Sequence, residues 1–152
     1  MKNKALNSSL VLIILALSAC GQTEVNHQIK AKAEKHLIQN FKAATNINWD
    51  QEGDEIEAEF EEAGINYSVK YSAQGEWLET EKELNADALP AEIIAAINAK
   101  FANAEIEDAE WVETAKESFY ELNVEADHSD YEVKLTPNGN IISSTIEEDE
   151  ED

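Results

Sequence analysis

The chain has 152 residues and a formal net charge of −22, with 33 acidic side chains against 11 lysines and no arginine. Such a surface repels the phosphates of nucleic acids and of anionic lipids, which argues against both as partners recognised by charge. A cationic protein or peptide, and weakly bound divalent cations, remain as partners. Because the chain contains a single cysteine, an intramolecular disulfide is excluded and the fold must depend on its hydrophobic core.

The segment 1–19 has the pattern of a lipoprotein signal peptide. Lys2 and Lys4 precede the apolar run 10–17, which is too short to span a membrane as a mature helix. The tetrapeptide that ends at Cys20 matches the bacterial lipobox, whose cysteine receives diacylglycerol. We therefore expect Cys20 to carry acyl chains such as palmitate. These chains would hold the protein firmly at the membrane, because each buried methylene contributes ~0.8 kcal/mol to anchoring. The alternative is an ordinary secretory peptide with a chance cysteine. Gly21, and not an aspartate, follows the cysteine, as is usual in lipoproteins of the outer membrane, so we expect the protein at the periplasmic face of that membrane.

Three further segments follow the signal peptide. Residues 20–28 are polar and predict a short tether off the membrane. Residues 29–146 have the length of one folded domain. Residues 147–152 are an uninterrupted acidic run, which self-repulsion and the lack of apolar side chains should leave disordered.

Within the domain, the hydrophobic pattern predicts a helix and four strands, twice. Apolar residues at helical spacing predict an amphipathic helix over 29–44, with lysines off the apolar stripe. Pro90 suits the first turn of a second helix, which extends to Phe101. Alternation of apolar and polar residues predicts eight strands, at 46–51, 55–61, 65–72, 76–83, 106–113, 119–126, 131–136 and 140–146.

The two halves repeat one pattern. In the strands Tyr67 falls on Tyr131 and Gly75 on Gly139, and in the helices Leu37 falls on Ile97. We therefore predict two tandem copies, repeat one at 29–83 and repeat two at 90–146. The interval between equivalent positions is longer in the strands than in the helices, so the strands or loops of the second copy should contain a short insertion.

The one-sided distribution of apolar residues predicts the fold class. Every predicted strand carries its apolar residues on one face, as antiparallel sheets do when helices cover one side and water the other. We predict an α+β fold in which two helices pack on one face of an antiparallel sheet of about eight strands. The other face should be polar and rich in glutamate.

That polar face is the candidate binding surface, and its candidate partner-binding residues are Glu55, Glu57, Glu59, Trp111, Glu121 and Glu125. The first three alternate along one strand at a spacing of roughly 7 Å. Trp111 joins them if Val112 takes the inward position, and aromatic anchors dominate many interfaces. The alternative is a solvated acidic face that serves solubility, with the tryptophan in the core.

The sequence predicts no catalytic residue, cofactor or transition-metal site. Residues 127–130 (Asp-His-Ser-Asp) contain the residue types of a hydrolase triad, but contiguous loop residues rarely converge, and a polar hairpin loop accounts for them. The three histidines lack metal-ligand spacing, and the acidic runs lack the EF-hand pattern. A divalent-cation-binding or cation-responsive structural protein is therefore the alternative to a binding module.

Several motifs carry a resemblance to a known family. They are Tyr-x-Val-x-Tyr from Tyr67, Gly-Glu-Trp-Leu-Glu-Thr-Glu ending at Glu81, Leu89-Pro90, and Tyr-x-Val-x-Leu from Tyr131. Over about residues 33–146 the chain resembles the PepSY-like family of bacterial envelope proteins. The resemblance implies a fold like that of beta-lactamase inhibitor proteins and a periplasmic binding or inhibitory module without catalytic residues. The matching residues are structural, so they imply a fold and leave the ligand open.

Overall fold

A computed structural model describes residues 27–147. The predicted signal peptide, the predicted lipidation site Cys20, and most of the tether and of the acidic tail lie outside these residues. No helix in the described range is long and apolar enough to cross a membrane. The elements, in chain order, are α1 (His27–Asn40), β1 (Thr45–Glu52), β2 (Glu55–Glu62), β3 (Ile65–Tyr71), β4 (Trp77–Glu83), the short 3₁₀ helix η1 (Ala86–Ala88), α2 (Ala91–Lys100), β5 (Glu105–Thr114), β6 (Ser118–Ala126), β7 (Ser129–Leu135) and β8 (Ile141–Ile146).

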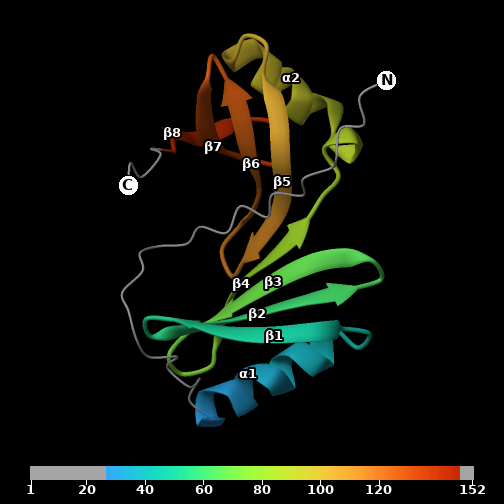
Figure 1. The fold of residues 1–152 in the computed structure, drawn as a ribbon, viewed down its shortest axis with the longest axis vertical. Helices are drawn as coiled ribbons and strands as arrows, with labels where there is room; N and C mark the ends of the chain where they lie inside the picture. Colours follow the sequence, from blue (N-terminus) through green and yellow to red (C-terminus); the bar gives the residue numbers. More distant parts are fainter. Residues whose placement is uncertain (1–26, 148–152) are drawn as a thin grey trace, which may run out of the picture.

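The eight strands form one antiparallel sheet in which each strand pairs with the next one along the chain. The fold is therefore α+β, with an eight-stranded open sheet and two helices, as predicted at this level. The joint between the halves is the β4–β5 pair, which runs from Glu79 opposite Thr114 to Glu83 opposite Glu110. Because the sheet is strongly twisted, β1–β3 cross β5–β7 at a large angle (Figure 1).

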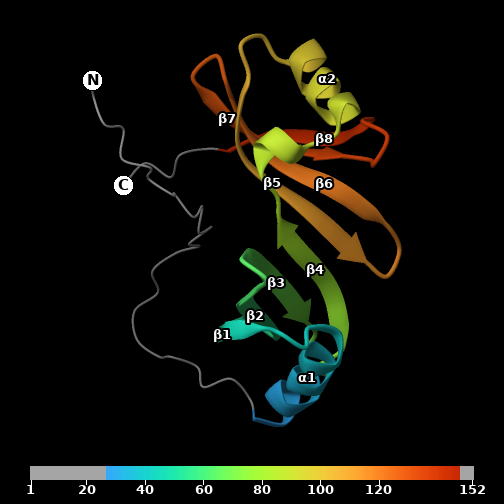
Figure 2. The same ribbon diagram turned by 90° about the vertical axis from the view of Figure 1, so that its right-hand side faces the viewer.

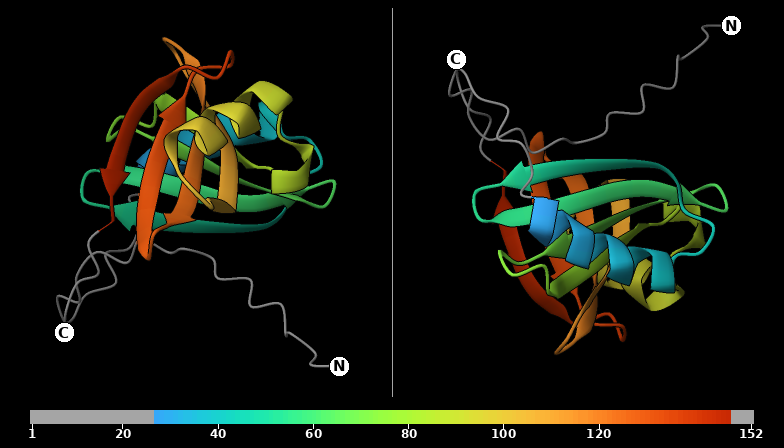
Figure 3. Two further views of the ribbon diagram at one scale, coloured as in Figure 1. Left: turned by 90° about the horizontal axis from the view of Figure 1, so that it is seen from above. Right: turned by 90° about the horizontal axis from the view of Figure 1, so that it is seen from below.

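The core consists of two clusters, one in each half. In the first, Leu37 of α1 is fully buried in a cluster that includes Tyr71 of β3. In the second, Ile97 of α2 is buried together with Leu122 of β6. Each such side chain contributes roughly 1.5–3 kcal/mol when it is fully removed from water. Each helix lies at the end of the molecule formed by its own half (Figures 2 and 3).

The strand registers of the two halves correspond. Asp50 lies opposite Glu57 in the β1–β2 pair, and Glu110 lies opposite Glu121 in the β5–β6 pair. Both pairs also contain a register shift at the corresponding place, before Asn48 in β1 and before Asp108 in β5. The stretch from Glu110 to Glu121 is longer than the stretch from Asp50 to Glu57. The extra residues of the second half therefore fall in the hairpin between β5 and β6.

The first helix is shorter at its end than predicted, because it stops at Asn40 and not at residue 44. Phe41 still donates its backbone N–H to the carbonyl of Leu37 at 2.8 Å, and the chain then turns towards β1. Phe41 and Ala44 nevertheless pack against the first core cluster. Their helical spacing was therefore misleading, since a loop places the same side chains in the core.

Candidate functional site

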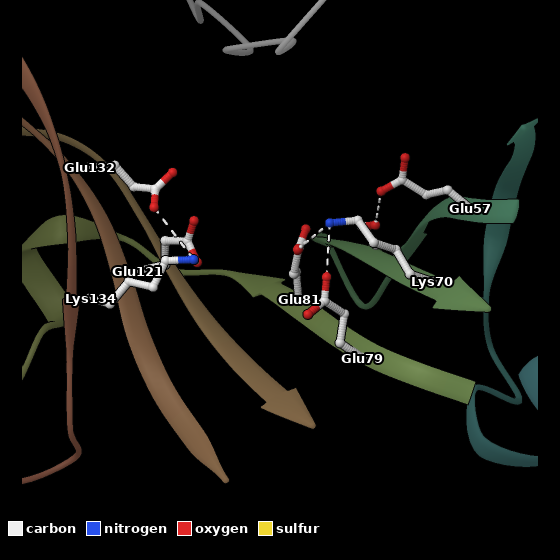
Figure 4. A network of polar contacts seen from close by, with 8 residues as sticks. Glu57, Lys70, Glu79, Glu81, Glu121, Glu132 and Lys134 are labelled. Atoms are coloured by element: carbon white, nitrogen blue, oxygen red, sulfur yellow. Dashed lines mark hydrogen bonds and ion pairs between the residues drawn. The ribbon is translucent and has the colours of Figure 1, made fainter. Parts of the chain in front are cut away.

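The side of the sheet opposite the helices, called the open face below, carries most of the strand carboxylates. In β2, Ile56, Ala58 and Phe60 are buried in the core, so strand alternation directs Glu57 and Glu59 to the other side. The same alternation applies to the strands that follow. It gathers eight side chains that we call the carboxylate network: Glu57, Lys70, Glu79, Glu81, Glu110, Glu121, Glu132 and Lys134. Figure 4 shows the two lysines with the carboxylates that they contact, and Glu57 beside them.

Lys70 in β3 is the cation of the first half. Its Nζ lies 2.9 Å from Glu79 Oε1 and 2.8 Å from Glu81 Oε1, and both carboxylates belong to the neighbouring strand β4. Burial alone would lower the pKa of the Lys70 ammonium, but the hydrogen bonds and charges of Glu81 and Glu79 outweigh it and raise the pKa. Lys70 is therefore held in its charged form. Glu57 on the other neighbouring strand accepts a hydrogen bond from the Ser68 hydroxyl.

Lys134 in β7 occupies the position that corresponds to Lys70 in β3. Its Nζ lies 3.1 Å from Glu121 Oε2 and 3.4 Å from Glu132 Oε1. It also lies over the ring of Phe119, 5.6 Å from the ring centroid, which adds a cation–π contact. Each half therefore has one lysine shared between two carboxylates.

Glu110 lies between the two lysine sites and has no lysine of its own. It pairs across β4–β5 with Glu83 and across β5–β6 with Glu121. Burial, together with the negative charges of Glu81 and Glu121, raises the pKa of the Glu110 carboxyl to about 7. Burial also raises the pKa of Glu81 and of Glu121, against the opposing effect of their lysines. The centre of the open face therefore holds carboxylates whose charge is not compensated.

This arrangement favours the binding of a cation over catalysis. A half-buried carboxylate with a raised pKa gains most from an added positive charge, because that charge replaces lost hydration and lowers the pKa again. Arginine and lysine side chains bind carboxylates through short, charge-assisted hydrogen bonds. A basic side chain that reached Glu110 would therefore displace protons from the network as it bound.

The predicted glutamates divide into two groups. Glu57 and Glu121 belong to the carboxylate network and occupy corresponding positions in the two halves. Glu55 lies exposed at the start of β2, and Glu125 is exposed beside Glu105 and Asp130 at the far end of β6. Glu59 faces the same side as Glu57 but makes no contact with either lysine of the network. The predicted surface is therefore acidic as a whole, and only its centre is half-buried.

The predicted position of Trp111 is wrong. Trp111 lies opposite Lys82 and Tyr120, on the side of the sheet that bears the helices. Val112, expected to point inward to the helices, lies on the other side and is nevertheless buried. The cause is the bulge in β5, where the register shifts between Ile106 and Asp108 and reverses the alternation for the rest of the strand.

Trp111 instead lines a groove of about 550 Å³ beside α1. Its indole Nε1 donates to Glu113 Oε1 at 2.9 Å, and its ring packs edge-on against Tyr120. Trp77 also lines the groove, and its indole N–H donates to the Thr80 hydroxyl at 2.9 Å. The groove is thus separated from the carboxylate network by the thickness of the sheet. Its remaining lining residues are His36, Asn40, Phe41, Tyr67 and Lys82.

Within the segment 127–130, Asp127 and His128 form the hairpin turn between β6 and β7, and Ser129 and Asp130 begin β7. Asp127 and His128 have positive φ values of 52° and 66°, as the two central residues of a tight hairpin turn require, and both are exposed. His36 contacts Tyr71, its Nδ1 lying 3.2 Å from the phenol oxygen, and burial lowers the pKa of its imidazole. Within residues 27–147, no group of three or more His, Cys, Asp or Glu side chains is arranged to hold a metal ion.

Sequence reasoning missed both lysines and four of the six carboxylates of the network. Lys70 and Lys134 each occupy the polar position after the buried valine of corresponding strands. Superposing the two predicted copies would therefore have revealed them as an equivalent pair within the chain. No comparable signal marks Glu110, whose surroundings depend on the β4–β5 joint.

Comparisons with known proteins agree with this fold. Residues 51–143 match the family described as "Putative beta-lactamase-inhibitor-like, PepSY-like". A search of curated proteins found no match. Three similar solved structures come from Bacteroides. A BLIP-like protein of Bacteroides fragilis has 23% sequence identity and a TM-score of 0.70, covering 80% of this chain and 90% of that one.

The other two structures give the same result. A DUF2874 family protein of Bacteroides uniformis has 21% identity and a TM-score of 0.71, covering 76% of this chain and 88% of that one. A protein of Bacteroides eggerthii, described among "putative periplasmic proteins", has 20% identity and a TM-score of 0.69, covering 76% and 86%. At these identities the likeness establishes the fold, and the family match covers more than half of the chain. The chain therefore belongs to the PepSY-like, beta-lactamase-inhibitor-like family.

Proposed function

We propose that this chain is a non-catalytic, inhibitor-like binding module of the cell envelope, which contacts a basic protein or peptide through the carboxylate network. The observation that carries the proposal is an imbalance of charge. Six carboxylates of the network face two ammonium groups, and each ammonium is already shared between two carboxylates. The family description as inhibitor-like supports a binding role.

The physical basis is electrostatic complementarity. A chain with a net charge of −22 attracts basic partners over distances comparable to the Debye length, about 10 Å at 0.1 M salt. At contact, a lysine or arginine of the partner takes the uncompensated charge of Glu110 and its neighbours. Binding should therefore weaken with added salt and release protons near neutral pH, where Glu110 is only partly ionised.

We further propose that the module lies at the periplasmic face of the outer membrane, where acyl chains on Cys20 hold it. The signal peptide pattern of residues 1–19 supports this location. The structural neighbour from Bacteroides eggerthii is described among "putative periplasmic proteins", which agrees with this location. We further propose that the domain is two tandem copies of one unit, a helix followed by four strands, supported by the corresponding strand registers of the two halves.

Crosslinking from the open face tests the proposal directly. A photo-crosslinking residue in place of Asn123, which lies between Asp108 and Glu132 on the open face, should capture the partner in native envelopes. The same residue in place of Lys100, which is exposed at the end of α2, is the matched control. Partner adducts that form from the Lys100 position and not from the Asn123 position would contradict the proposal.

Binding of the captured partner then identifies the residues involved. The double variant Glu110→Gln/Glu121→Gln should weaken binding severalfold and reduce its salt dependence, because it removes two central charges. The control Glu92→Gln/Glu105→Gln makes the same change of charge at exposed positions away from the network. Equal affinities for the two double variants would show that net charge, and not the network, attracts the partner.

The alternative from sequence, a cation-responsive protein, is tested by calorimetry with calcium. Hard divalent ions require clustered oxygen ligands, and the described residues contain no group of side chains arranged for one. Saturable heat at sub-millimolar calcium that Glu110→Gln abolishes would favour the alternative. Heat no larger than that of a charge-matched unstructured peptide would leave the binding module as the better explanation.

A further inference from the structure

The outer edge of the sheet at β8 differs from every other strand. Of the eight strands in residues 27–147, β8 is the one without a charged side chain, with the sequence Ile-Ile-Ser-Ser-Thr-Ile. Ile142 and Ile146 are 51% and 59% exposed, the second being the most exposed large apolar side chain among the described residues. Edge strands of this kind are usually protected by charges or bulges, because their free N–H and C=O groups pair readily with another strand.

The opposite edge, β1, has such protection. It carries Asp50, and its register is interrupted after Thr45, where Asn46 has a positive φ of 57°. The irregular backbone and the charge both disfavour the addition of a further strand. The β8 strand also has a register shift, at Ile142, but from Ser143 to Ile146 it pairs regularly and carries no charged side chain, so this segment lacks both kinds of protection.

The edge of β4 corresponds to the edge of β8, and in this molecule another strand, β5, already pairs with it. The correspondence that relates β3 to β7 also relates β4 to β8: Tyr67 pairs with Lys82, and Tyr131 pairs with Ile146. In the first half the outer edge of β4 is covered by β5, with Lys82 opposite Trp111. The equivalent position in the second half is Ile146, and no described strand lies beyond it.

Corresponding residues of β8 and β4 direct their backbone N–H groups to the same side, which is the outer edge of each half. Leu84 donates its N–H to the carbonyl of Ala109 in β5 at 2.8 Å, so the N–H of Lys82 also points towards β5. Glu147 donates its N–H inward, to the carbonyl of Asp130 at 2.9 Å. By alternation, the N–H groups of Ile146 and Ser144 point outward from the sheet.

We propose that the free edge of β8, from Ser143 to Glu147, binds an extended strand of a basic partner protein, antiparallel and in the register of the β4–β5 joint. In that register the partner residue opposite Ile146 occupies the position of Trp111, and an aromatic or large aliphatic side chain there covers the exposed isoleucine. The preceding partner residue occupies the position of Glu110 and faces Glu147.

The charge around Glu147 selects the class of partner. Glu147 lies near Asp130, Glu132 and Glu121, whose charges, added to burial, raise the pKa of its carboxyl. A lysine or arginine at the facing position removes this repulsion, whereas a second copy of this acidic chain adds to it. The partner motif is thus a basic residue followed by an aromatic residue and then β-branched residues. This inference uses a surface different from the carboxylate network and does not depend on the function proposed for it.

A designed peptide tests the inference with the chain's own β5 sequence. The probe is residues 108–116 with Glu110→Lys and Glu113→Thr, labelled with a fluorophore, and its binding to the purified protein is followed by anisotropy. A probe with Glu113→Pro in place of Glu113→Thr lacks the N–H that faces Ser144 in this register, and it is the peptide control. We expect the first probe to bind and the proline probe not to bind.

Two protein variants locate the site. Ser144→Pro removes an outward N–H at an edge position that does not pair with β7, and the loss of that hydrogen bond, with local repacking, should weaken the probe by about tenfold. Ile146→Lys should weaken it through loss of apolar contact and repulsion of the basic probe. The matched control is Ile47→Lys, the same substitution at a 39% exposed isoleucine on β1, which should bind normally. Circular dichroism verifies that each variant is folded.

Amide hydrogen exchange of the unmodified protein gives a readout that needs no variant. The Ser144 and Ile146 amides should exchange rapidly in the free protein and become protected on addition of the probe. Protection already present in the free protein, probe-induced shifts confined to the open face or to the Trp111 groove, or unchanged binding by both β8 variants would each overturn the inference. Concentration-dependent dimers that Ser144→Pro abolishes would assign the edge to a second copy and refute the basic partner.

Discussion

Neutralising Glu110 should stabilise the protein, and the gain should depend on pH. Glu110 is half-buried between Glu81 and Glu121 and has no lysine partner, so its carboxyl has a pKa of about 7 in place of its ordinary 4.5. The folded state therefore binds a proton between these two values that the unfolded state releases. The stability contributed by this group is complete below pH 4.5 and is lost as the pH rises through 7.

The magnitude follows from the difference in pKa. At 1.36 kcal/mol per pH unit, the change from 4.5 to about 7 corresponds to at most about 3.4 kcal/mol of free energy of unfolding at pH 8. Water still reaches part of the carboxyl and screens its neighbours, so we expect about half of this value, ~1.5 kcal/mol. The variant Glu110→Gln should therefore unfold like the wild type at pH 4 and be more stable by ~1.5 kcal/mol at pH 8.

Urea denaturation of both proteins at pH 4, 5, 6, 7 and 8 measures this difference. The matched control is Glu105→Gln, which removes the same charge from an exposed position at the start of the same strand. Its effect on the free energy of unfolding should be small at every pH. A gain for Glu110→Gln that is equal at pH 4 and pH 8, or equal to that of Glu105→Gln, would refute the burial and repulsion assigned to Glu110.

Three further predictions concern the fold that holds the network. Lys70→Met leaves two half-buried carboxylates without their ammonium, so the free energy of unfolding at pH 8 should fall by about 1–3 kcal/mol. A loss below about 0.5 kcal/mol, in the range of surface ion pairs, would show that water screens the site fully. Leu37→Ala and Ile97→Ala each open a cavity under a fully buried side chain, and each should cost about 2–5 kcal/mol in urea denaturation; a negligible cost for either would contradict its place in the core. Gly139→Ala should lower the melting temperature much more than Gly64→Ala. Both glycines have a φ of +79°, but only at Gly139 would an added Cβ lie 2.7 Å from a helix carbonyl, that of Glu92. Equal melting temperatures for the two variants would place that helix farther from the turn.

The close approach at Gly139 also explains how each helix is positioned. An added Cβ at Gly139 would lie against the backbone of α2, and one at Gly75 would lie 2.9 Å from the carbonyl of Ile29 in α1. The two glycines occupy equivalent positions in the two halves, in the turns before β8 and β4. The glycines predicted as turn residues therefore have a second role, since they let each helix contact the hairpin of its own half.

Local chemistry in the sequence was sufficient to predict the elements of this fold. Period-two alternation in segments such as 55–61 fixes which side chains can reach a core, and Pro90, directly before α2, suits the start of a helix through its fixed φ. The prediction that eight strands and two helices form an α+β fold is confirmed, because these signals act over a few residues. The same reasoning identified an acidic face, since every second residue of a half-buried strand must face away from the core.

The tertiary structure alone decided which carboxylates act together and which face Trp111 occupies. A single bulge in β5 reverses every later side chain of that strand. The break in alternation at Glu107 and Asp108 does not by itself decide whether Trp111 or Val112 faces the helices. The raised pKa of Glu110 likewise requires Glu81 and Glu121 from two neighbouring strands, which pairing across the sheet brings beside it. Strand register is set by contacts between distant segments, so the charged centre of the open face and the free edge at β8 follow from the assembled sheet and not from any single stretch of sequence.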